Sequence, residues 1–598
     1  MSDHVRFQAE YTKLNPAQKR AVDAIDGPVM VVAGPGTGKT QVLALRIANI
    51  ITKTDTPPSG VLCLTFTNAG VRAMRERLAR LMGARGNEVH VATFHRFAIS
   101  LIEKHYGVLG LDQAPVLISD AEAIALADDI LENREWSHLR PRGDSAKYFS
   151  DLKSLISLLK REHLSPSDFL AEVDAEIESV RTNPENISSR GARKGELKRE
   201  AESAIASLER TREAVHFYEA YEEAKTARGL MDYDDVLTYA VRIAQEGEDA
   251  RADIRENHLY VLVDEHQDSS GVQNAFLEAV WAGTEQPNIF VVGDDRQLIY
   301  GFGGASIEQF TRFRTLFGKA EEITLIQNYR STQTILDTAD ALLQSQIAEG
   351  KLQSTSKATE ENILIAECDY PRDEIIFAAK RIRERIAAGI PAEECAILVP
   401  KNYQARSAME TLREQGIPVA VEGALSFFAQ PETLTVRRIF SALADPYDPV
   451  SLGALLLDPS IRIAPLEAHR YLRANLRKIS LTALIEYAMS RLPTDPIARF
   501  GAQMQDFLES SQSLGLHGLV QKIGEVLFFE HPSDHESLLR QVESIRTFLH
   551  LLAARQEKDP HLSLADFSAY LDRLEQYGHD VPLAVFAGAR ARRSEERR

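Results

Sequence analysis

One run of eight residues combines glycines with a lysine and a hydroxyl, and it reads Ala33, Gly34, Pro35, Gly36, Thr37, Gly38, Lys39 and Thr40. An apolar stretch precedes it, and helical apolar spacing follows it from residue 42. This is the spacing of a phosphate-binding P-loop, in which the lysine reaches the terminal phosphates and the hydroxyl meets Mg²⁺. The flanking patterns disfavour an ordinary glycine-rich turn. The run therefore predicts that Lys39 and Thr40 bind a nucleoside triphosphate.

Two adjacent carboxylates, Asp264 and Glu265, follow the apolar run 259–263. A strand that ends on such a pair suits a Walker B site, where Asp264 holds Mg²⁺ through water and Glu265 polarises the attacking water. The alternative is a strand-ending acidic turn. The P-loop in the same chain favours the metal site.

Three other side chains could serve the same nucleotide. Gln18 is by itself a polar helix residue, but its amide can both donate to and accept from the edge of adenine. Gln297 lies on a loop after a strand-like run and could sense the γ-phosphate. Arg330 lies at the entry to a second series of strands and helices, where it could act as an arginine finger.

Aromatic side chains also follow predicted strands. His95 comes directly after the run 89–93, and Tyr300 and Phe302 follow Gln297. In open α/β sheets this edge is where ligands bind. Tyr300 and Phe302 could stack on nucleic-acid bases or pack in a core. From the residues alone, core packing is the better interpretation for either one.

Alternating strands and helices must position these residues. The apolar run before the P-loop and strand-like runs at 61–67, 89–93, 259–263 and 288–293 predict an α/β P-loop fold with a parallel sheet. A second series begins near residue 322 and includes strand-like runs at 363–368 and 395–399 around an amphipathic helix. The nucleotide cleft is expected between these two α/β units.

Size and composition fit a globular chain of several domains. The 598 residues are 44% hydrophobic and 26% charged, and no segment is apolar enough to span a membrane. The N-terminal sequence does not have the pattern of a signal peptide. The three cysteines lie far apart in the sequence, which suggests a reducing compartment. The net charge of −18 argues weakly against a general polyanion binder. Local basic faces would have to carry any DNA contact.

In this order, the motifs resemble those of the UvrD/Rep family of superfamily 1 DNA helicases. The match runs from about residue 14 to 567 and includes the Gln18 segment, the P-loop, Leu64-Thr65-Phe66-Thr67-Asn68, Thr93-Phe94-His95, Val263-Asp264-Glu265-His266-Gln267-Asp268, Gly293-Asp294-Asp295-Arg296-Gln297 with Ile299-Tyr300-Gly301-Phe302, and Asn328-Tyr329-Arg330-Ser331. The resemblance implies two RecA-like motor domains, each with a helical insertion, that use ATP and Mg²⁺ to walk 3′ to 5′ along single-stranded DNA.

The resemblance also implies a role for each matching residue. Gln18 would read adenine and Tyr329 would stack on it, while Gln297 and Arg330 would sense the γ-phosphate. The DNA path would be lined by Phe66, Asn68, His95, Tyr300 and Phe302. Expected partners are single-stranded DNA and single-strand/double-strand junctions, with no membrane. A cytoplasmic location and a role in DNA repair or recombination follow by analogy.

The expected domains follow from the same comparison. The first motor domain would comprise residues 1–111 and 231–320, interrupted by a helical insertion at 112–230. The first part of the second motor domain would comprise 321–447, followed by a second insertion at 448–575 and a charged, disordered tail at 576–598.

The sequence departs from the family pattern at four positions. His266 replaces an aromatic residue, Arg296 stands where an acid is commoner, Gly303 removes an arginine, and Gln41 follows the P-loop where arginine is frequent near the base. Weaker strand contact and altered adenine contacts are the expected results.

Two family segments are absent from residues 1–598: a Thr-x-His-x-x-Lys-Gly-Leu-Glu-like segment and a second arginine finger. The second motor domain is therefore expected to be incomplete, with slow ATP hydrolysis and no DNA unwinding by this chain alone. Three hypotheses follow: an incomplete copy of a 3′–5′ helicase, a remnant that only binds ATP and single-stranded DNA, and the N-terminal part of a helicase-nuclease subunit. No nuclease motif supports the third.

Overall fold

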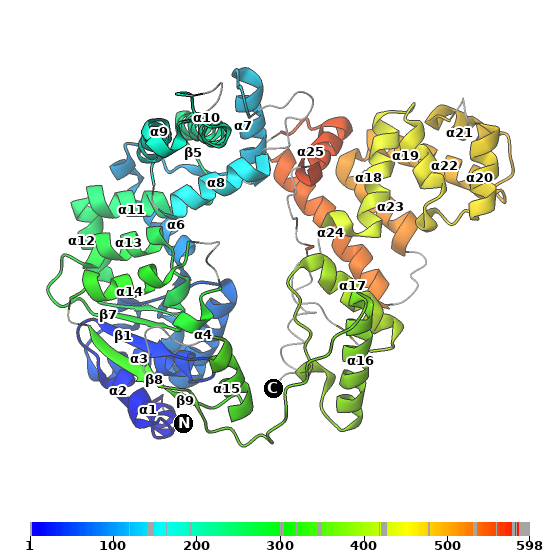
Figure 1. Cartoon of the computed structure of the whole chain (residues 1–598). Helices are drawn as coiled ribbons and strands as arrows, with labels where there is room; N and C mark the ends of the chain where they lie inside the picture. Colours follow the sequence, from blue (N-terminus) through cyan, green and yellow to red (C-terminus); the bar gives the residue numbers. More distant parts are fainter. Residues whose placement is uncertain are drawn as a thin grey trace. The chain divides into compact units, whose positions relative to one another are not determined.

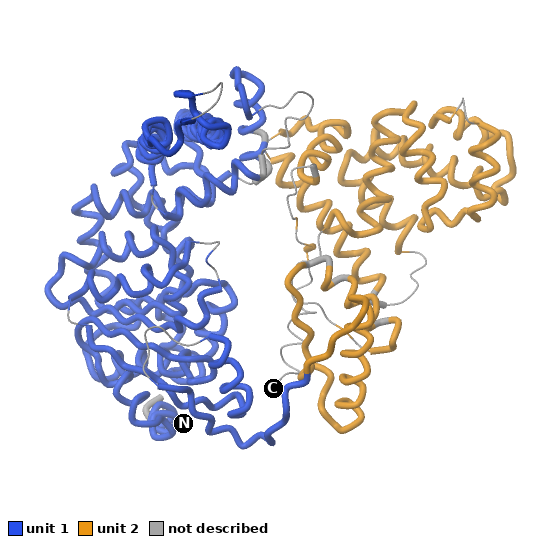
Figure 2. The backbone as a smooth tube through the Cα atoms, viewed as in Figure 1, with its two compact units in different colours: residues 1–364 blue, residues 365–598 orange. Residues whose placement is uncertain are grey.

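The computed structural model describes the chain except for residues 1–2, 119, 140–148, 163, 190–193, 300, 302–303, 319, 344–349, 418, 420–426, 476–478, 530–534, 558, 577–580, 582 and 585–598. It divides into two compact units, residues 1–364 and 365–598 (Figure 2). Tyr300, Phe302, Gly303 and most of the expected tail lie outside the described residues.

Unit 1 is built on a six-stranded parallel sheet with the order β3-β2-β6-β7-β1-β8. Its strands are β1 (Val29–Ala33), β2 (Val61–Thr65), β3 (His90–Thr93), β6 (Tyr260–Val263), β7 (Ile289–Gly293) and β8 (Glu321–Leu325). Every residue of β1, β2, β6 and β7 is buried, as expected for parallel strands that helices cover on both faces.

Helices cover the two faces of this sheet and form two separate cores. Met30 and Val32 point into one core, and Val29, Val31 and Ala33 point into the other, because successive strand residues face opposite sides. One face carries α1 (Asp3–Tyr11), α2 (Pro16–Asp23), α3 (Lys39–Lys53), α4 (Asn68–Met82) and α5 (Ala84–Asn87). The other carries α6 (Phe94–His105), α11 (Asp235–Glu246), α12 (Glu248–Asn257), α13 (Gly271–Trp281) and α14 (Ile307–Leu316) (Figure 1).

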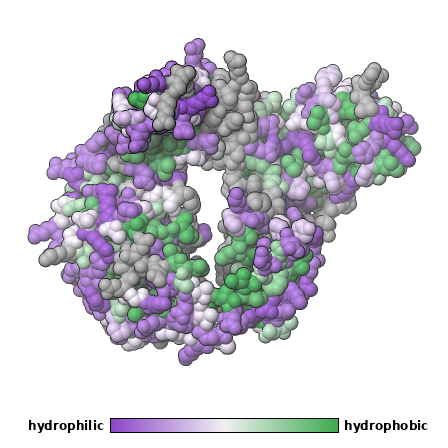
Figure 3. Space-filling model, in the orientation of Figure 1, coloured by the Kyte–Doolittle hydropathy of each residue, from purple (hydrophilic) through white to green (hydrophobic). Residues whose placement is uncertain are grey.

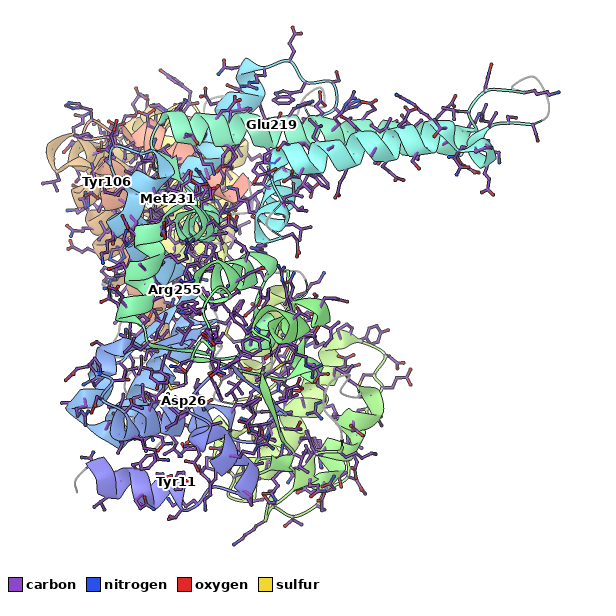
Figure 4. The ribbon with its side chains drawn as sticks, turned by 90° about the vertical axis from the view of Figure 1, so that its left-hand side faces the viewer. Tyr11, Asp26, Tyr106, Glu219, Met231 and Arg255 are labelled. Carbon is purple, nitrogen blue, oxygen red and sulfur yellow. The ribbon has the colours of Figure 1, made fainter. Side chains whose placement is uncertain are left out.

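A helical segment is inserted between two short strands of unit 1. Strands β4 (Val116–Leu117) and β5 (Leu230–Met231) pair in parallel and bring both ends of this insertion together. Between them lie α7 (Asp120–Asn133), α8 (Phe149–Arg161), α9 (Pro166–Thr182) and α10 (Arg199–Ala227). Figure 4 shows α10, which carries Glu219, lying along α9 and projecting from the unit, with Met231 near its base.

The division between the two compact units does not coincide with residue 321, the expected start of the second motor domain. Strand β8 pairs with β1 along five residue pairs, from Val29–Glu321 to Ala33–Leu325, so it completes the first sheet. The following segment contains β9 (Gln327–Asn328), α15 (Gln333–Leu342) and β10 (Gln353–Ser354), and it also belongs to unit 1. The division of the structure therefore falls at residue 364.

The described residues of unit 2 form helices joined by non-helical segments, and no strand lies among them. Its helices are α16 (Pro371–Ala387), α17 (Asn402–Glu414), α18 (Pro431–Ala444), α19 (Pro449–Leu456), α20 (Pro465–Ala474), α21 (Leu481–Met489), α22 (Pro496–Ser513), α23 (Gly515–Gly524), α24 (His535–Gln556) and α25 (Leu564–Gln576). Helices α16 and α17 share a small core of Ala379, Leu412 and Ile417.

The two strands expected in the second motor domain, at 363–368 and 395–399, are not formed. Residues 363–368 and 395–399 are described, but neither segment has strand pairing with any other described residue. Ile365 and Leu398 are 90% and 94% exposed, and Figure 3 shows hydrophobic surface over this part of the unit. A strand needs a neighbour for its backbone N–H and C=O groups, so apolar, β-branched sequence is not sufficient.

Among the described helices, none combines the length and the apolar character that crossing a bilayer requires.

Candidate nucleotide and nucleic-acid site

The expected P-loop residues connect β1 to α3 at the carboxyl edge of the sheet. Gly36 and Gly38 have φ values of 69° and 87°, a conformation that residues with a Cβ seldom adopt. A Cβ on Gly36 would lie 2.7 Å from the Arg330 Cβ. The Thr37 hydroxyl donates to the Gly34 carbonyl at 2.7 Å and closes the loop. The loop is thus compact, and the chain of residues 328–330 packs directly against it.

Lys39 and Glu265 meet across the site. The Lys39 Nζ lies 2.8 Å from Glu265 Oε2, and the lysine side chain is only 9% exposed. The Glu265 carboxylate also accepts a hydrogen bond from Gln267 Nε2 at 2.9 Å. The two motifs predicted from sequence therefore form one site, in which the ammonium of Lys39, the candidate phosphate ligand, pairs with the candidate catalytic carboxylate.

Glu265 has an unusual backbone. Its φ of 48° places it in the left-handed region, one of three such non-glycine residues among those described. This conformation costs of the order of 1 kcal/mol or more and is concentrated at functional sites. Here it turns the chain directly after β6, so that the Glu265 side chain reaches Lys39 while Asp264 stays buried.

The acidic side of the site carries more negative charge than Lys39 can neutralise. Burial, and then the charge of Glu265, raises the pKa of Asp264 to about 6 and that of Asp268 to about 7. Asp268 Oδ1 is buried without a hydrogen-bond partner among the described residues. These hard oxygen donors, with the Thr40 hydroxyl at the start of α3, fit a divalent cation such as Mg²⁺.

A hydrogen-bond chain links this site to the loop after β7. Gln267 Oε1 accepts from the Asp294 backbone N–H at 3.0 Å, and Asp294 Oδ2 accepts from Gln297 Nε2 at 2.7 Å. Arg296, one of the four departures, donates through Nε to Asp294 Oδ1 at 3.0 Å. Three hydrogen bonds therefore connect Glu265 to Gln297.

Gln18 and Tyr329 lie together beside the P-loop. Gln18 Nε2 donates to the Thr37 carbonyl at 2.8 Å, and Gln18 Oε1 accepts from the Asn15 N–H at 3.1 Å. The Asn15 side chain in turn donates to the Tyr329 hydroxyl at 2.9 Å. Gln18 thus has both amide groups satisfied within the protein, and reading adenine would require it to exchange one of these bonds.

Arg330 belongs to the same unit as the P-loop. The sequence placed it at the entry to a second α/β unit, but the Tyr329 N–H donates to the Gly36 carbonyl at 2.9 Å, and Asn328 donates to the Pro35 carbonyl. No carboxylate among the described residues pairs with the Arg330 guanidinium, which is exposed. It is therefore available to an anion bound at the loop.

The expected DNA-contacting residues lie at the ends of β2 and β3. Phe66 is 38% exposed, and Asn68 begins α4. The His95 ring stacks on Tyr233, with ring centroids 4.2 Å apart and an angle of 12° between the planes. Burial is the main cause that lowers the pKa of His95 to about 4, so its ring is neutral at physiological pH.

Sequence reasoning missed Tyr233, Gln267 as a link, and Asn328 as a clamp on the P-loop. Tyr233 lies between aspartates in a tight turn, and it is 55% exposed. An aromatic residue in the acidic run Asp232 to Asp235 was the available signal. Its stacking partner lies 138 positions earlier in the chain, so nothing local indicated the pair.

Comparison with known proteins places the chain in a family. The model of the UvrD/REP helicase N-terminal domain matches residues 14–318, and that of the UvrD-like helicase C-terminal domain matches residues 323–580. The chain belongs to the UvrD/REP helicase family. It is therefore a helicase-type enzyme with an α/β P-loop fold, as the motifs predicted.

Curated relatives include the ATP-dependent DNA helicase PcrA of two staphylococci. The protein from Staphylococcus aureus strain Mu50 is 24% identical over 558 residues, which cover 92% of this chain and 70% of that protein. The protein from Staphylococcus epidermidis strain ATCC 12228 is 24% identical over 559 residues, which cover 92% of this chain and 71% of that protein.

Two departures of this UvrD/REP helicase from the family pattern now have structural explanations. Gln41 donates to Glu10 Oε2 at 3.3 Å, which ties α3 to α1. His266 occupies an aromatic pocket, 5.7 Å from the Phe310 ring and 6.0 Å from the Phe313 ring, and its Nδ1 lies 3.1 Å from Ser269 Oγ. A histidine thus replaces an aromatic ring in a fully buried position.

His266→Phe is expected to reduce acid sensitivity. Burial lowers the pKa of His266 to about 3, so between pH 6.5 and 3 the unfolded chain binds a proton that the folded chain does not. This histidine therefore lowers the free energy of unfolding by about 1.4 kcal/mol for each pH unit below 6.5.

Between pH 7 and pH 5, the free energy of unfolding of the parent should fall by about 2 kcal/mol more than that of the phenylalanine variant. Urea unfolding followed by the fluorescence of the two tryptophans, Trp136 and Trp281, measures this. His216→Asn, at an exposed position, serves as the control, and equal pH slopes for parent and variant would refute the assignment.

Proposed function

We propose that this UvrD/REP helicase is an ATP-dependent motor that moves 3′ to 5′ along single-stranded DNA and acts at single-strand/double-strand junctions. The observation that carries the proposal is the contact of Lys39 with Glu265, extended through Gln267 and Asp294 to Gln297. This chain of contacts joins a nucleotide-binding loop to a loop at the same sheet edge. The PcrA relatives are ATP-dependent DNA helicases by name, which agrees with the proposal.

The nucleotide would lie along the P-loop with its base near Gln18 and Tyr329. The backbone of residues 33–38 and the ammonium of Lys39 would bind the phosphates. Thr40 and Asp264 would hold Mg²⁺, which would neutralise charge on the phosphates. Glu265 would orient and deprotonate the attacking water, while Gln297 and Arg330 would contact the γ-phosphate. Lys39 must leave Glu265 as the phosphates bind, so nucleotide binding itself releases the carboxylate for catalysis.

Single-stranded DNA would cross the neighbouring strand ends. Phe66, Asn68 and the His95–Tyr233 stack offer aromatic and amide groups, and Tyr300 and Phe302 stay predictions because they lie outside the described residues. Base stacking on aromatic rings is worth about 1–3 kcal/mol per base and does not depend on sequence. A role in repair or recombination and a cytoplasmic location belong to the same proposal.

A protein made of residues 1–598 is expected to bind ATP and single-stranded DNA but to hydrolyse ATP slowly and unwind no duplex. The unpaired segments 363–368 and 395–399 support this expectation, because they leave unit 2 without a sheet among its described residues. Steady-state ATPase assays with and without oligo(dT), and a strand-displacement assay, test it. Rapid DNA-stimulated ATP hydrolysis would refute the expectation of slow hydrolysis and favour an active helicase.

The same unpaired segments favour one alternative, a module that binds ATP and single-stranded DNA without moving. The motor and the passive binding module differ in how bound nucleotide changes their affinity for DNA. A motor should change its DNA affinity between ATP-bound and ADP-bound states, whereas a passive binder should not. Anisotropy titrations of a labelled oligonucleotide with a non-hydrolysable ATP analogue and with ADP distinguish them.

A further inference from the structure

A buried cluster of five charged residues lies where the helical insertion joins the sheet-containing part of unit 1. It consists of Lys160 on α8, Glu222 and Lys225 on α10, Asp232 directly after β5, and Asp235 at the start of α11. The side chains of Lys160, Lys225 and Asp235 are 2%, 0% and 2% exposed. This ionic cluster, named here the lysine–aspartate cluster, lies away from the P-loop and has no assigned part in the reaction.

Both lysines contact all three carboxylates. Lys160 Nζ lies 2.5 Å from Asp235, 3.1 Å from Asp232 and 2.8 Å from Glu222. Lys225 Nζ lies 2.5 Å, 2.9 Å and 2.8 Å from the same three carboxylates. Burial alone would lower the pKa of Lys160, but the surrounding carboxylates raise it well above its ordinary value. The positions that could otherwise hold a metal ion are occupied by two ammonium groups.

The lysines of the lysine–aspartate cluster bind the two aspartates at the ends of the turn 232–235, which carries the exposed ring of Tyr233. Asp232 and Asp235 exchange backbone-to-carboxylate hydrogen bonds of 2.7 Å and 2.9 Å, which fix the turn. Between them, Asp234 accepts from the Ser157 hydroxyl of α8 at 2.5 Å. All three aspartates that flank Tyr233 are therefore held by helices of the insertion. The Tyr233 ring itself projects from the turn and stacks on His95.

Stability alone does not account for this arrangement. Removing two ammonium groups and three carboxylates from water costs several kcal/mol per ion, and a packed apolar cluster of the same volume is often equally stable or more stable. What an ionic cluster adds is geometric definition, because each ammonium donates hydrogen bonds to both Asp232 and Asp235 and also lies within ion-pair distance of Glu222. The group whose geometry is defined is the turn bearing Tyr233.

We propose that the lysine–aspartate cluster is a positioning device that holds Tyr233 against His95 and so couples the helical insertion to single-stranded DNA binding. The inference rests on the proposed function, since it takes the His95–Tyr233 stack as a DNA contact. A movement of α8 or α10 would shift the turn and change the surface offered to a base. The insertion thereby influences DNA affinity without touching the base itself.

The test compares Tyr233→Ala with two cluster variants, Asp235→Asn and Lys225→Met, in the full chain. DNA affinity is measured by anisotropy with labelled oligo(dT) at fixed salt, and stacking by the fluorescence of a single 2-aminopurine in the same oligonucleotide. Tyr233→Ala should weaken affinity about tenfold, within the range of one lost base stack. Each cluster variant should weaken DNA affinity about three- to tenfold. It should also reduce the quenching of 2-aminopurine fluorescence that stacking causes on binding. Binding of a fluorescent ATP analogue should not change.

The decisive measurement is non-additivity. If the cluster acts through Tyr233, Asp235→Asn in the Tyr233→Ala background should cost less than about twofold, since the group it positions is already gone. An equal loss in both backgrounds would show a general structural role and overturn the inference. Lys104→Met is the control, because it removes an exposed ion pair to Asp253 from the helix that carries His95.

The outcomes separate the inference from the proposed function. If Tyr233→Ala leaves DNA affinity unchanged, the proposed DNA contact fails, and the inference fails with it. If Tyr233→Ala weakens binding and the folded cluster variants do not, only the inference fails. Ser157→Ala removes one hydrogen bond and no charge, so it provides the same comparison if either charged variant does not melt cooperatively. In that case a loss of about two- to threefold that vanishes in the Tyr233→Ala background would support the inference, and no loss would overturn it.

Discussion

Lys39→Ala is expected to weaken ATP binding by one to two orders of magnitude and to slow single-turnover hydrolysis by about 10²–10³-fold. The ammonium would make charge-assisted hydrogen bonds to the phosphates, each worth about 1.5–3 kcal/mol. It would also stabilise charge that develops on the transferred phosphoryl group. Lys39 is 9% exposed and pairs with Glu265 Oε2 at 2.8 Å, so it is fixed in the site. Equilibrium titration with a fluorescent ATP analogue and rapid-quench hydrolysis at excess enzyme measure the two effects.

Lys53→Ala is the matched control for this variant. Lys53 ends the same helix, α3, and its exposed side chain pairs with Asp23 at 3.2 Å. A surface pair of this kind contributes little to stability, so ATP binding should be unchanged. If Lys39→Ala bound ATP as well as Lys53→Ala, the P-loop assignment would be wrong.

Glu265→Gln is expected to separate binding from chemistry. Loss of a general base costs about 10²–10⁴ in rate, so single-turnover hydrolysis should fall by that factor. ATP binding should stay equal or become a few-fold tighter, because the neutral amide competes less for Lys39 than the carboxylate does. Glutamine has the same length as glutamate and meets the same left-handed backbone, so the turn after β6 should persist.

Glu256→Gln, on the exposed face of α12, should change neither quantity. Normal hydrolysis by Glu265→Gln would show that another carboxylate activates water, and Asp268 would become the next candidate because its buried oxygen has no partner among the described residues. A variant that lost both binding and hydrolysis would instead indicate that Glu265 supports the shape of the loop.

The sequence was most informative where chemistry is encoded locally. The glycine spacing before Lys39 and the apolar run before Asp264 predicted a P-loop and an acidic strand end, and both lie at the same sheet edge. Parallel strands bring their carboxyl ends together, so a correct assignment of strands is enough to predict proximity. Family membership followed from the same ordered motifs.

Local patterns misled where a structure depends on a distant partner. Residues 363–368 and 395–399 have strand-like composition but no pairing among the described residues, and β8 joined the first sheet instead of starting a second one. Backbone hydrogen bonds between strands are made by whichever segment lies alongside, and one segment's own residues do not specify it.

By itself, then, the sequence determined the nucleotide chemistry, the parallel α/β fold and the helicase family. Only the tertiary structure decided the pairing of Lys39 with Glu265, the internal satisfaction of Gln18, the placement of Arg330 in the same unit as the P-loop, and the stack of His95 on Tyr233. The physical reason is the separation along the chain of the residues that make each contact. A loop's conformation is set by its own glycines and neighbours, whereas these contacts join residues up to hundreds of positions apart and exist only once the sheet and its insertion have packed.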